Sequence, residues 1–299
     1  MAATALDVLC VGHASYDLVF EVAAHPKADE KTVADSLLAC GGGPAANAAV
    51  QAARLGCLSG FCGYLGADLY GDAHLQELIK AGVNVELVVR GSMPTPLSAI
   101  IVKPDGARSL INYKGETKAL FAEALDLSAA RAKVFLFDGH EPYLSRRLLE
   151  LDVGRTPSVL DGGSWHPGTE QLLPLVDYPV CSEKFAAQFA GGPEAALARL
   201  AENHPAALVT LGERGLIWRR GAEQGRLPAP PGIAAVDSTG AGDAFHGAFA
   251  AGLAAGLPWL ALLRFASAAG ALCCTRLGAR PGLPFTAEVE ALLAAWPAV

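Results

Sequence analysis

Positive charge is in short supply in this sequence. Its 299 residues include 23 lysines and arginines against 30 aspartates and glutamates, a formal net charge of −7 at pH 7. Proteins that hold nucleic acid or an anionic membrane surface by charge present a basic face, because the phosphate groups must be neutralised. The charge balance therefore predicts that neither nucleic acid nor a membrane is a partner of this chain.

Paired cysteines and a secretory leader are also missing. The seven cysteines are odd in number and form no C-x-x-C pair; they are Cys10, Cys40, Cys57, Cys62, Cys181, Cys273 and Cys274. This pattern argues against a disulfide framework or a zinc site and is typical of reduced thiols. The first residues carry no basic segment, and Asp7 interrupts any apolar run. We therefore expect a cytoplasmic protein without a signal peptide.

No apolar run is long and clean enough to predict a membrane span. Residues 247–263 come nearest, but several glycines and Pro258 interrupt them, and Asp243 and Arg264 flank them. Proline in the middle of such a run ends or kinks a helix. The run therefore predicts two buried helices that are separated at Pro258.

Three catalytic motifs are absent. No G-x-x-x-x-G-K-[ST] sequence occurs, which excludes a Walker-type phosphate-binding loop. Residues 240–245 fail the dinucleotide pattern G-x-G-x-x-G at its last position, and they do not follow a first strand. Residues 162–166 resemble a hydrolase elbow, but Trp165 and His166 replace the glycine of the sharp turn. A dehydrogenase and a hydrolase are both poorly supported.

The apolar residues, 52% of the chain, alternate between short runs and helical stretches. This alternation is typical of βαβ units and a mainly parallel sheet. We expect strands at residues 7–12, 58–65, 134–137, 158–160 and 207–211, an antiparallel return at 215–219, and helices at 44–55 and 72–81. The strands that end near 137 and 160 are each followed by an acid, Asp138 and Asp161. No linker or repeat divides the chain, so residues 1–299 are expected to form a single domain.

Two segments, at about residues 15–39 and 97–114, break the βαβ alternation. Residues 16–22 and 31–39 have strand-like patterns, and 97–102 with 109–113 predict a hairpin around the turn Pro104-Asp105-Gly106. Together they predict a small separate sheet that serves as a lid, with extra edge strands on the main sheet as the alternative. We expect one apolar face on this sheet, partly covered by a second copy in a homodimer; its residues would be Leu18, Phe20, Val22, Ile100 and Val102.

Residues 237–249, with the sequence DSTGAGDAFHGAF, carry the strongest chemical signal. Gly240, Ala241 and Gly242 bring bare backbone to the start of an apolar helix, where unpaired N–H groups and the helix dipole attract an anion. Asp243 would repel that anion, so its presence indicates a function. A carboxylate beside a phosphate site is the position of the base in phosphoryl transfer. The alternative is an ordinary aspartate cap of a helix.

Two weaker elements surround this signal. In residues 41–47, Gly43 and its neighbouring glycines let backbone approach a ligand closely, and Asn47 offers both a donor and an acceptor to a polyol. Asp17 lies near the end of the first strand, at the edge where open α/β sheets place their ligands. The loop that contains Thr210, Gly212 and Gly215 follows a strand and suits a nucleotide, although a plain turn has the same composition.

Taken together, the two glycine-rich elements resemble the signatures of the PfkB, or ribokinase-like, carbohydrate kinases. Residues 42–49 with Gly56 and Gly66 match the N-terminal signature, and residues 237–243 with 247–250 match the C-terminal one. The resemblance spans essentially the whole chain. It implies a three-layer α/β/α sandwich with a mainly parallel central sheet and a small β-sheet lid.

The resemblance also implies roles for individual residues. Asp243 would be the base, and the amides around Gly240, Ala241 and Gly242 would form the anion hole. The remaining roles are assigned by position: Asp17, Gly43, Asn47 and Glu141 to the sugar; Thr210, Gly212, Gly215 and Ser182 to the nucleotide; and Asp237, Thr239, Cys273, Gly278 and Gly282 to a monovalent cation, which in many members of the family is K⁺.

Two details of the resemblance bear on metal and substrate. The family's Asn-x-x-Glu pattern, whose glutamate helps to organise Mg²⁺, is replaced here by Ser182-Glu-Lys-Phe185. Several stretches are similar to sulfofructose kinases, in which positions equivalent to Lys31 and Asn112 contact the sulfonate. His140, however, stands where those enzymes have an arginine, and a neutral imidazole binds an anion less strongly than a guanidinium.

These implications define an expected activity. The chain would transfer the γ-phosphate of ATP to a hydroxyl of a ketose, a related sugar or an anionic sugar derivative, with Mg²⁺ and K⁺ as cofactors. A nucleoside kinase of the same family is one alternative. The other is a regulator that binds nucleotide or sugar on this fold without catalysis, because Phe185 replaces the acid linked to the metal.

Overall fold

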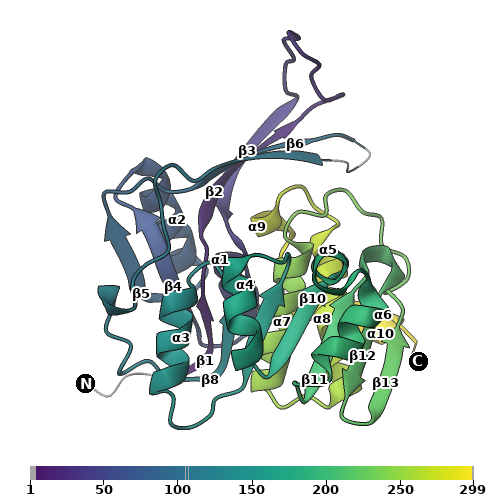
Figure 1. Ribbon diagram of the computed structural model, residues 1–299. Coiled ribbons are helices and arrows are strands. Elements are labelled where there is room, and N and C mark those ends of the chain that lie inside the picture. The colour runs from purple at the N-terminus through teal and green to yellow at the C-terminus, as the bar shows by residue number, and fades with distance from the viewer. Residues whose placement is uncertain (1–4, 105, 107, 298–299) are drawn as a thin grey trace.

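A nine-stranded sheet runs through the body of the protein in the computed structural model, which describes residues 5–104, 106 and 108–297 (Figure 1). From one edge to the other, the strands are β13 (Glu223–Leu227), β12 (Leu216–Arg220), β11 (Ala206–Thr210), β10 (Tyr178–Ser182), β9 (Ser158–Gly162), β8 (Ala132–Phe137), β1 (Leu6–Val11), β4 (Ser59–Gly66) and β5 (Asn84–Gly91). Strands β11, β12 and β13 pair antiparallel, and the other pairs are parallel.

Helices cover both faces of this sheet. One face carries α1 (Pro44–Arg54), α2 (Leu69–Lys80), α7 (Ala241–Ala254), α8 (Trp259–Cys273) and α10 (Thr286–Ala295), and the other α3 (Pro142–Leu151), α4 (Pro167–Leu172), α5 (Glu183–Ala190) and α6 (Pro193–Leu200). Val8 and Cys10 of β1 enter the first core, whereas Leu9 and Val11 enter the second. Because side chains alternate along a strand, a strand buried on both faces is apolar throughout, and the expected three layers are confirmed.

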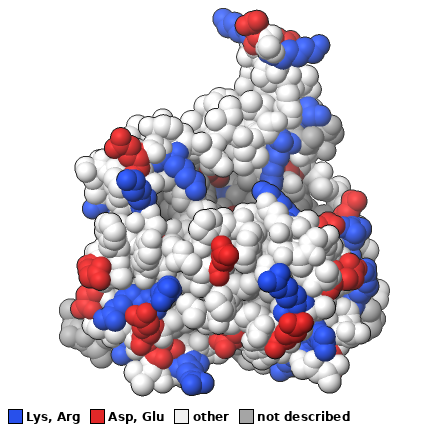
Figure 2. All heavy atoms as spheres, viewed as in Figure 1, with Lys and Arg blue, Asp and Glu red and all other residues white. Residues whose placement is uncertain are grey.

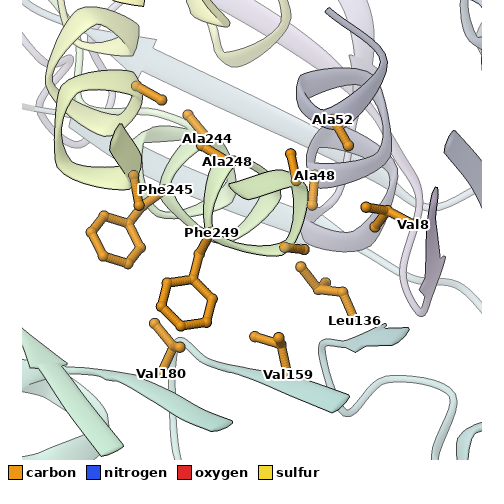
Figure 3. Close-up of a cluster of buried hydrophobic side chains, with 14 of the residues drawn as sticks. Val8, Ala48, Ala52, Leu136, Val159, Val180, Ala244, Phe245, Ala248 and Phe249 are labelled. Atoms are coloured by element: carbon orange, nitrogen blue, oxygen red, sulfur yellow. The ribbon is translucent and has the colours of Figure 1, made fainter. Parts of the chain in front are cut away.

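Helix α7 occupies the centre of the first core. Phe245 and Phe249 point from it towards Val159 and Val180 on the sheet, and Ala48 and Ala52 of α1 lie beside it (Figure 3). The helix crosses α1 at Gly247, where an added Cβ would lie 2.6 Å from the Ala48 carbonyl oxygen. Small residues thus allow two helices that carry site residues to approach closely.

Most of the expected elements are confirmed within a few residues, including the antiparallel return at β12 and the break at Pro258, which caps α8. Among the described residues, every helix is too short or too polar to cross a lipid bilayer. The expected strand at residues 31–39 is wrong in its first half, because β3 (Ser36–Gly42) pairs with its neighbour only from Ser36 onward. The turn-rich segment 276–284 contains a short helix, α9 (Ala279–Gly282).

The lid is a separate four-stranded sheet in the order β3, β2 (Ser15–Glu21), β6 (Leu97–Val102), β7 (Arg108–Tyr113). Of the expected turn between β6 and β7, Asp105 lies outside the described residues. The loop of residues 22–35 projects from the lid, away from the body (Figure 1). Figure 2 shows charged side chains gathered at this outermost end, where Lys27, Asp29, Glu30 and Lys31 are exposed.

The lid's apolar residues divide between its two faces, contrary to the expected single face. Ile100 pairs with Val19, and Ala99 pairs with Leu18, so Ile100 and Leu18 point to opposite sides. Val19, Ile100 and Val102 form a small buried cluster with Leu38 and Leu277 on the inner face. The outer face keeps three large apolar side chains in contact with water: Leu37, Ile111 and Tyr113 are 59%, 66% and 55% exposed.

Candidate active site

The first turn of α7 forms an open helix mouth. Gly240 precedes the helix with φ 79°, a left-handed conformation that favours glycine, and an added Cβ would lie 2.5 Å from the Ala279 Cβ. At Gly242, in contrast, an added Cβ would meet nothing within 4 Å, and the residue is exposed. Because the first amides of a helix lack intrahelical partners, this mouth can bind an anion.

Asp243 is held at this mouth by a chain of polar contacts from distant parts of the sequence. Asn47 Nδ2 of α1 donates to Asp243 Oδ2 at 2.7 Å, and Arg280 Nε of α9 donates to Asn47 Oδ1 at 3.2 Å. The guanidinium therefore fixes which end of the Asn47 amide faces the carboxylate. Burial raises the pKa of Asp243, and the hydrogen bond from Asn47 opposes this shift. The carboxylate is oriented and suited to accept a proton.

Asp17 lies in the middle of lid strand β2, not at the end of the first strand as expected. Its Oδ1 accepts a hydrogen bond from Ser15 at 2.9 Å, and burial raises its pKa. Gly42 packs directly against it, since an added Cβ there would lie 2.1 Å from Asp17 Oδ2. Gly43, with φ 92°, lies close to the backbone of Ala14, since an added Cβ would lie 2.6 Å from the Ala14 Cα. The second glycine element thus joins the lid to the body beside Asp243.

Sequence reasoning missed three residues behind this junction. Arg280 is buried and contacts His74 Nε2 through Nη2 at 3.0 Å, and its Nη1 lies 3.9 Å from Glu77 Oε2. The same Glu77 oxygen accepts the Gly41 amide at 2.8 Å. The sequence gives no sign of this cluster, because Arg280 lies in the turn-rich segment 276–284 and His74 lies within the expected helix 72–81. No local pattern in the sequence connects positions more than two hundred residues apart.

Asp138, at the end of β8, fills the mouth of helix α1. Its carboxylate accepts the amides of His13 at 2.7 Å, Ala45 at 3.1 Å and His140 at 2.9 Å. Burial alone raises its pKa, but the His140 charge and these hydrogen bonds hold the pKa well below its usual range. The rings of His13 and His140 stack with centroids 4.9 Å apart. In the sequence this acid is recognisable only as the residue that follows a strand, and no pattern indicates its role.

A cavity of about 650 Å³ lies on the other side of the α7 mouth. Thr210, Gly212 and Gly215, the expected nucleotide loop, line it together with Ala241 and Gly242 of the helix. Ser182 is not among its lining residues. Instead, Ser182 Oγ caps α5, accepting the Phe185 amide at 3.0 Å and donating to the Gly163 carbonyl at 2.8 Å. The cavity therefore brings three of the four expected nucleotide residues to the start of α7.

The five positions expected for a monovalent cation also converge. Asp237 is fully buried, and its carboxylate accepts Thr239 Oγ1 at 2.6 Å and the Gly278 amide at 2.8 Å. Cys273 Sγ lies 3.6 Å from the Thr239 carbonyl, and Gly282 packs against the Cys273 carbonyl; an added Cβ at Gly282 would lie 2.5 Å from that oxygen. Buried carboxylate and carbonyl oxygens suit a hard cation.

One arginine of the lid reaches the same loop. Arg108 Nη1 donates to Thr239 Oγ1 at 2.6 Å and lies 3.7 Å from Asp237 Oδ1. Nearby, an added Cβ at Gly106 would lie 3.0 Å from the Val236 carbonyl oxygen. The lid therefore touches the segment that leads into α7.

The protein offers little to a magnesium ion directly. Phe185, which replaces the metal-linked glutamate, is fully buried and packs edge-on against Trp165. Glu183 is turned to an ion pair with Arg214 Nη2 at 2.5 Å. Within the described ranges, no group of three His, Cys, Asp or Glu side chains could hold a metal ion. Mg²⁺ usually keeps several waters and binds through substrate phosphates. A site without metal-binding side chains is therefore compatible with an ion that arrives with the nucleotide.

Three expected sugar-binding residues lie further from Asp243. Glu141 is buried at the start of α3, where its Oε2 accepts the Leu120 amide at 2.6 Å, and burial raises its pKa to about 7. Asn112 is exposed on β7, but it pairs with Ser98, which pairs with Asp17, so all three point to one face of the lid. Lys31 is exposed in the outer loop, which Figure 1 shows projecting away from the body.

Comparison with known proteins identifies the family of this chain. The chain matches the pfkB family of carbohydrate kinases over residues 5–286. It is 31% identical to the ribokinase of Bacillus subtilis (strain 168) over 96% of this chain and 99% of that protein, and 32% identical to the fructokinase of Klebsiella pneumoniae over 85% and 92%. The structure of Arabidopsis thaliana ribokinase complexed with ribose and ATP superimposes with a TM-score of 0.82, at 27% identity, over 97% of this chain and 99% of that one.

The fold and the site therefore define a carbohydrate kinase, a phosphotransferase with an alcohol group as acceptor. The chain belongs to the pfkB family, and its fold is the ribokinase fold, with a large, mostly parallel sheet between helices and a small separate lid.

Proposed function

We propose that this protein is one kinase domain that transfers the γ-phosphate of ATP to a hydroxyl of a ketose, a related sugar or an anionic sugar derivative. The observation that carries the proposal is the position of Asp243. Its carboxylate is oriented by Asn47 at 2.7 Å, and it lies in the same helix turn as Ala241 and Gly242, which line the nucleotide cavity. A base and an anion hole thus stand between the acceptor and donor sites.

The chemistry follows from this arrangement. The acceptor oxygen forms a bond to the γ-phosphorus, the bond from that phosphorus to the β,γ-bridging oxygen breaks, and the acceptor proton moves to Asp243. The amides of the α7 mouth stabilise charge on the transferring group. A monovalent cation held by Asp237 and neighbouring carbonyls would fix the loop that precedes those amides, and magnesium, bound through the phosphates, would supply charge neutralisation.

The acceptor site that we propose lies under the lid. Asp17, Gly43 and Asn47 surround the entrance to Asp243 with carboxylate, backbone and amide groups that suit sugar hydroxyls. Asn112 shares the inner face of the lid with Asp17, which supports recognition of a polar or anionic tail. The seven free cysteines, most of them buried, support function in a reducing cytoplasm.

A panel assay tests the activity and its alternatives. ATP consumption with Mg²⁺ is measured with ketoses, aldoses, their phosphorylated and sulfonated derivatives, and nucleosides. We expect turnover with one class of sugar. Turnover with nucleosides alone would make the chain a nucleoside kinase, and ligand-induced thermal stabilisation without any turnover would make it a binding regulator. Lys31→Met then tests the outer loop. A loss of turnover confined to anionic acceptors would assign Lys31 to binding of the anionic tail of the acceptor, and an equal effect on neutral and anionic acceptors would exclude that role.

We also propose that the lids of two copies pair. The outer face of the lid, carrying Leu37, Ile111 and Tyr113, is apolar and uncovered, and exposed apolar sheet surfaces of this kind are commonly covered in an assembly. Light scattering at assay concentration should give a dimer, and Ile111→Lys should shift it to the monomer. Leu260→Lys, an equally drastic change at an apolar residue of α8 that is 53% exposed, is the control and should leave the dimer intact. A fully active wild-type monomer would contradict this proposal.

A further inference from the structure

His246, three residues after Asp243 on α7, makes contacts that the proposed reaction does not use. It is buried, with 3% of its surface exposed. Its Nδ1 lies 2.6 Å from the Gly242 carbonyl oxygen, one turn earlier in the same helix. Its Nε2 lies 3.0 Å from the Val180 carbonyl oxygen of β10. The ring therefore joins the first turn of α7 to the central sheet.

Both partners of this ring are carbonyl oxygens, which only accept hydrogen bonds. Each ring nitrogen must then carry a hydrogen, and an imidazole with two N–H groups is a cation. The countercharge is beside it, because Asp161 Oδ2 of β9 lies 3.3 Å from Nδ1. Asp161 is buried, and Val180 is its direct neighbour in the sheet. A buried histidine–carboxylate pair thus lies beneath the first turn of α7.

The Gly242 carbonyl belongs to the same planar peptide unit as the Asp243 amide. A hydrogen bond that fixes the carbonyl therefore also fixes the direction of the N–H group at the helix mouth. A charged donor does this more strongly than a neutral one and polarises the peptide, which makes its N–H a better donor. The imidazolium also places a positive charge one helical turn behind the anion hole.

We propose that His246 and Asp161 form a positioning pair for phosphoryl transfer: His246, held by two carbonyl oxygens, orients the Gly242–Asp243 peptide of the anion hole and adds positive charge behind it, and Asp161 provides the countercharge beside the ring. This inference rests on the proposed kinase function. It assigns neither residue to direct contact with substrate.

Other charged groups also act on Asp243, and the test must separate them from the pair. They come from five elements and include both signs: Asp17 of β2, Arg108 of β7, Asp138 after β8, Asp161 of β9 and Arg280 of α9, in addition to His246 on α7 itself. Burial raises the pKa of Asp161 to about 6, so its carboxylate is mostly ionised above neutral pH. His246 and Asp161, which carry charges of opposite sign, can therefore be replaced singly and together.

The kcat–pH profile of three variants provides the first test. His246→Asn leaves Asp161 negative and unpaired, so the acid limb, which reports protonation of Asp243, should move to higher pH, with a plateau kcat lower by about tenfold. Asp161→Asn leaves the positive charge, so the acid limb should move to lower pH. The double variant should return the limb towards the wild-type position. His204→Asn is the matched control, because His204 bonds one carbonyl, that of Val176, away from the site.

A purely structural role predicts a different result. Both single variants would then lose stability and activity without opposite shifts of the acid limb, and that outcome would overturn the proposal. Nitrogen NMR of the wild-type protein provides a second readout that needs no activity and no variant to fold. Both ring nitrogens of His246 should show the shifts of protonated imidazolium at pH 7, and a neutral ring would equally overturn it. Absence of wild-type turnover would count against the kinase function alone.

Discussion

Helices α1 and α7 begin in the same way and end up with opposite tasks. Each follows a glycine in the left-handed region, Gly43 with φ 92° and Gly240 with φ 79°, and this glycine has no side chain that could cap the helix start. At α1, however, the Asp138 carboxylate accepts the Ala45 amide at 3.1 Å. At α7, Gly242 faces open space. One mouth is already filled by an anion of the protein, and the other is free to receive one.

The difference shows that a glycine-rich helix start does not by itself define an anion site. What matters is whether the fold supplies an acid to the helix mouth. Because Asp138 occupies the start of α1, an external anion cannot bind there, and the helix instead contributes Asn47 to the contact with Asp243. Asp243, in contrast, is drawn sideways to Asn47, which keeps its carboxylate out of the α7 mouth.

The largest expected effect is at the open mouth. Asp243→Asn keeps the shape of the side chain but removes the proton acceptor, so turnover should fall by about 10²–10⁴-fold while nucleotide binding and thermal stability stay close to wild type. Steady-state kinetics and a nucleotide titration measure this. Near-normal turnover would contradict the role of Asp243 as base.

The corresponding change at the filled mouth should act on stability instead. Asp138→Asn has one acceptor oxygen where the buried carboxylate accepts three amides, so the free energy of unfolding should fall by roughly 3 kcal/mol. The pKa of Asp138 is depressed in the folded state, so its contribution is fully present above the unfolded pKa of about 3.9 and is lost as pH falls below it. Urea unfolding at pH 6, 5 and 3 should show nearly the same difference at pH 6 and 5 and a smaller one at pH 3, where the unfolded aspartate is protonated. An equal difference at all three pH values would argue against a charged cap.

Replacing Gly242 or Gly240 by alanine should give the smallest effects, and the two changes in stability should have opposite sign. Gly242→Ala meets no neighbouring atom and replaces glycine in a helix, so stability should rise by up to about 1 kcal/mol, while turnover falls because the methyl group lies in the anion's path. Gly240→Ala is the matched control and should be destabilised, because it adds a contact of 2.5 Å with Ala279 to a left-handed backbone. Unchanged kinetics in Gly242→Ala would show that phosphate does not enter this mouth.

The two helix starts also differ in how much of their structure could be predicted from the sequence. The alternation of apolar runs predicted the parallel sheet, and the residues around Asp243 predicted the helix mouth, because both depend on neighbours close in the chain. The roles of Asp138 and Arg280 depend on contacts across 93 and 233 residues, with Ala45 and Asn47 respectively. Such contacts are made by the fold, so no local pattern announces them.

The lid illustrates a second limit. The period-two pattern predicted its strands but not which residues share a face, since register between β2 and β6 decides that Ile100 joins Val19 instead of Leu18. The expected strand at residues 31–39 included Lys31 because the residues that follow it have a strand-like pattern, but β3 pairs with β2 only from Ser36 onward.

The contact of Arg108 with Thr239 has a thermodynamic consequence. It ties the lid, which carries Asp17, to the loop that leads into the anion hole. If closing the lid over an acceptor strengthens this contact, the same free energy must appear in nucleotide affinity, because coupling between two binding sites is reciprocal. Each substrate would then raise the affinity for the other by the same factor. Because water cannot close the lid, it would not gain this increase, and the protein would disfavour water as an acceptor without a group that recognises it.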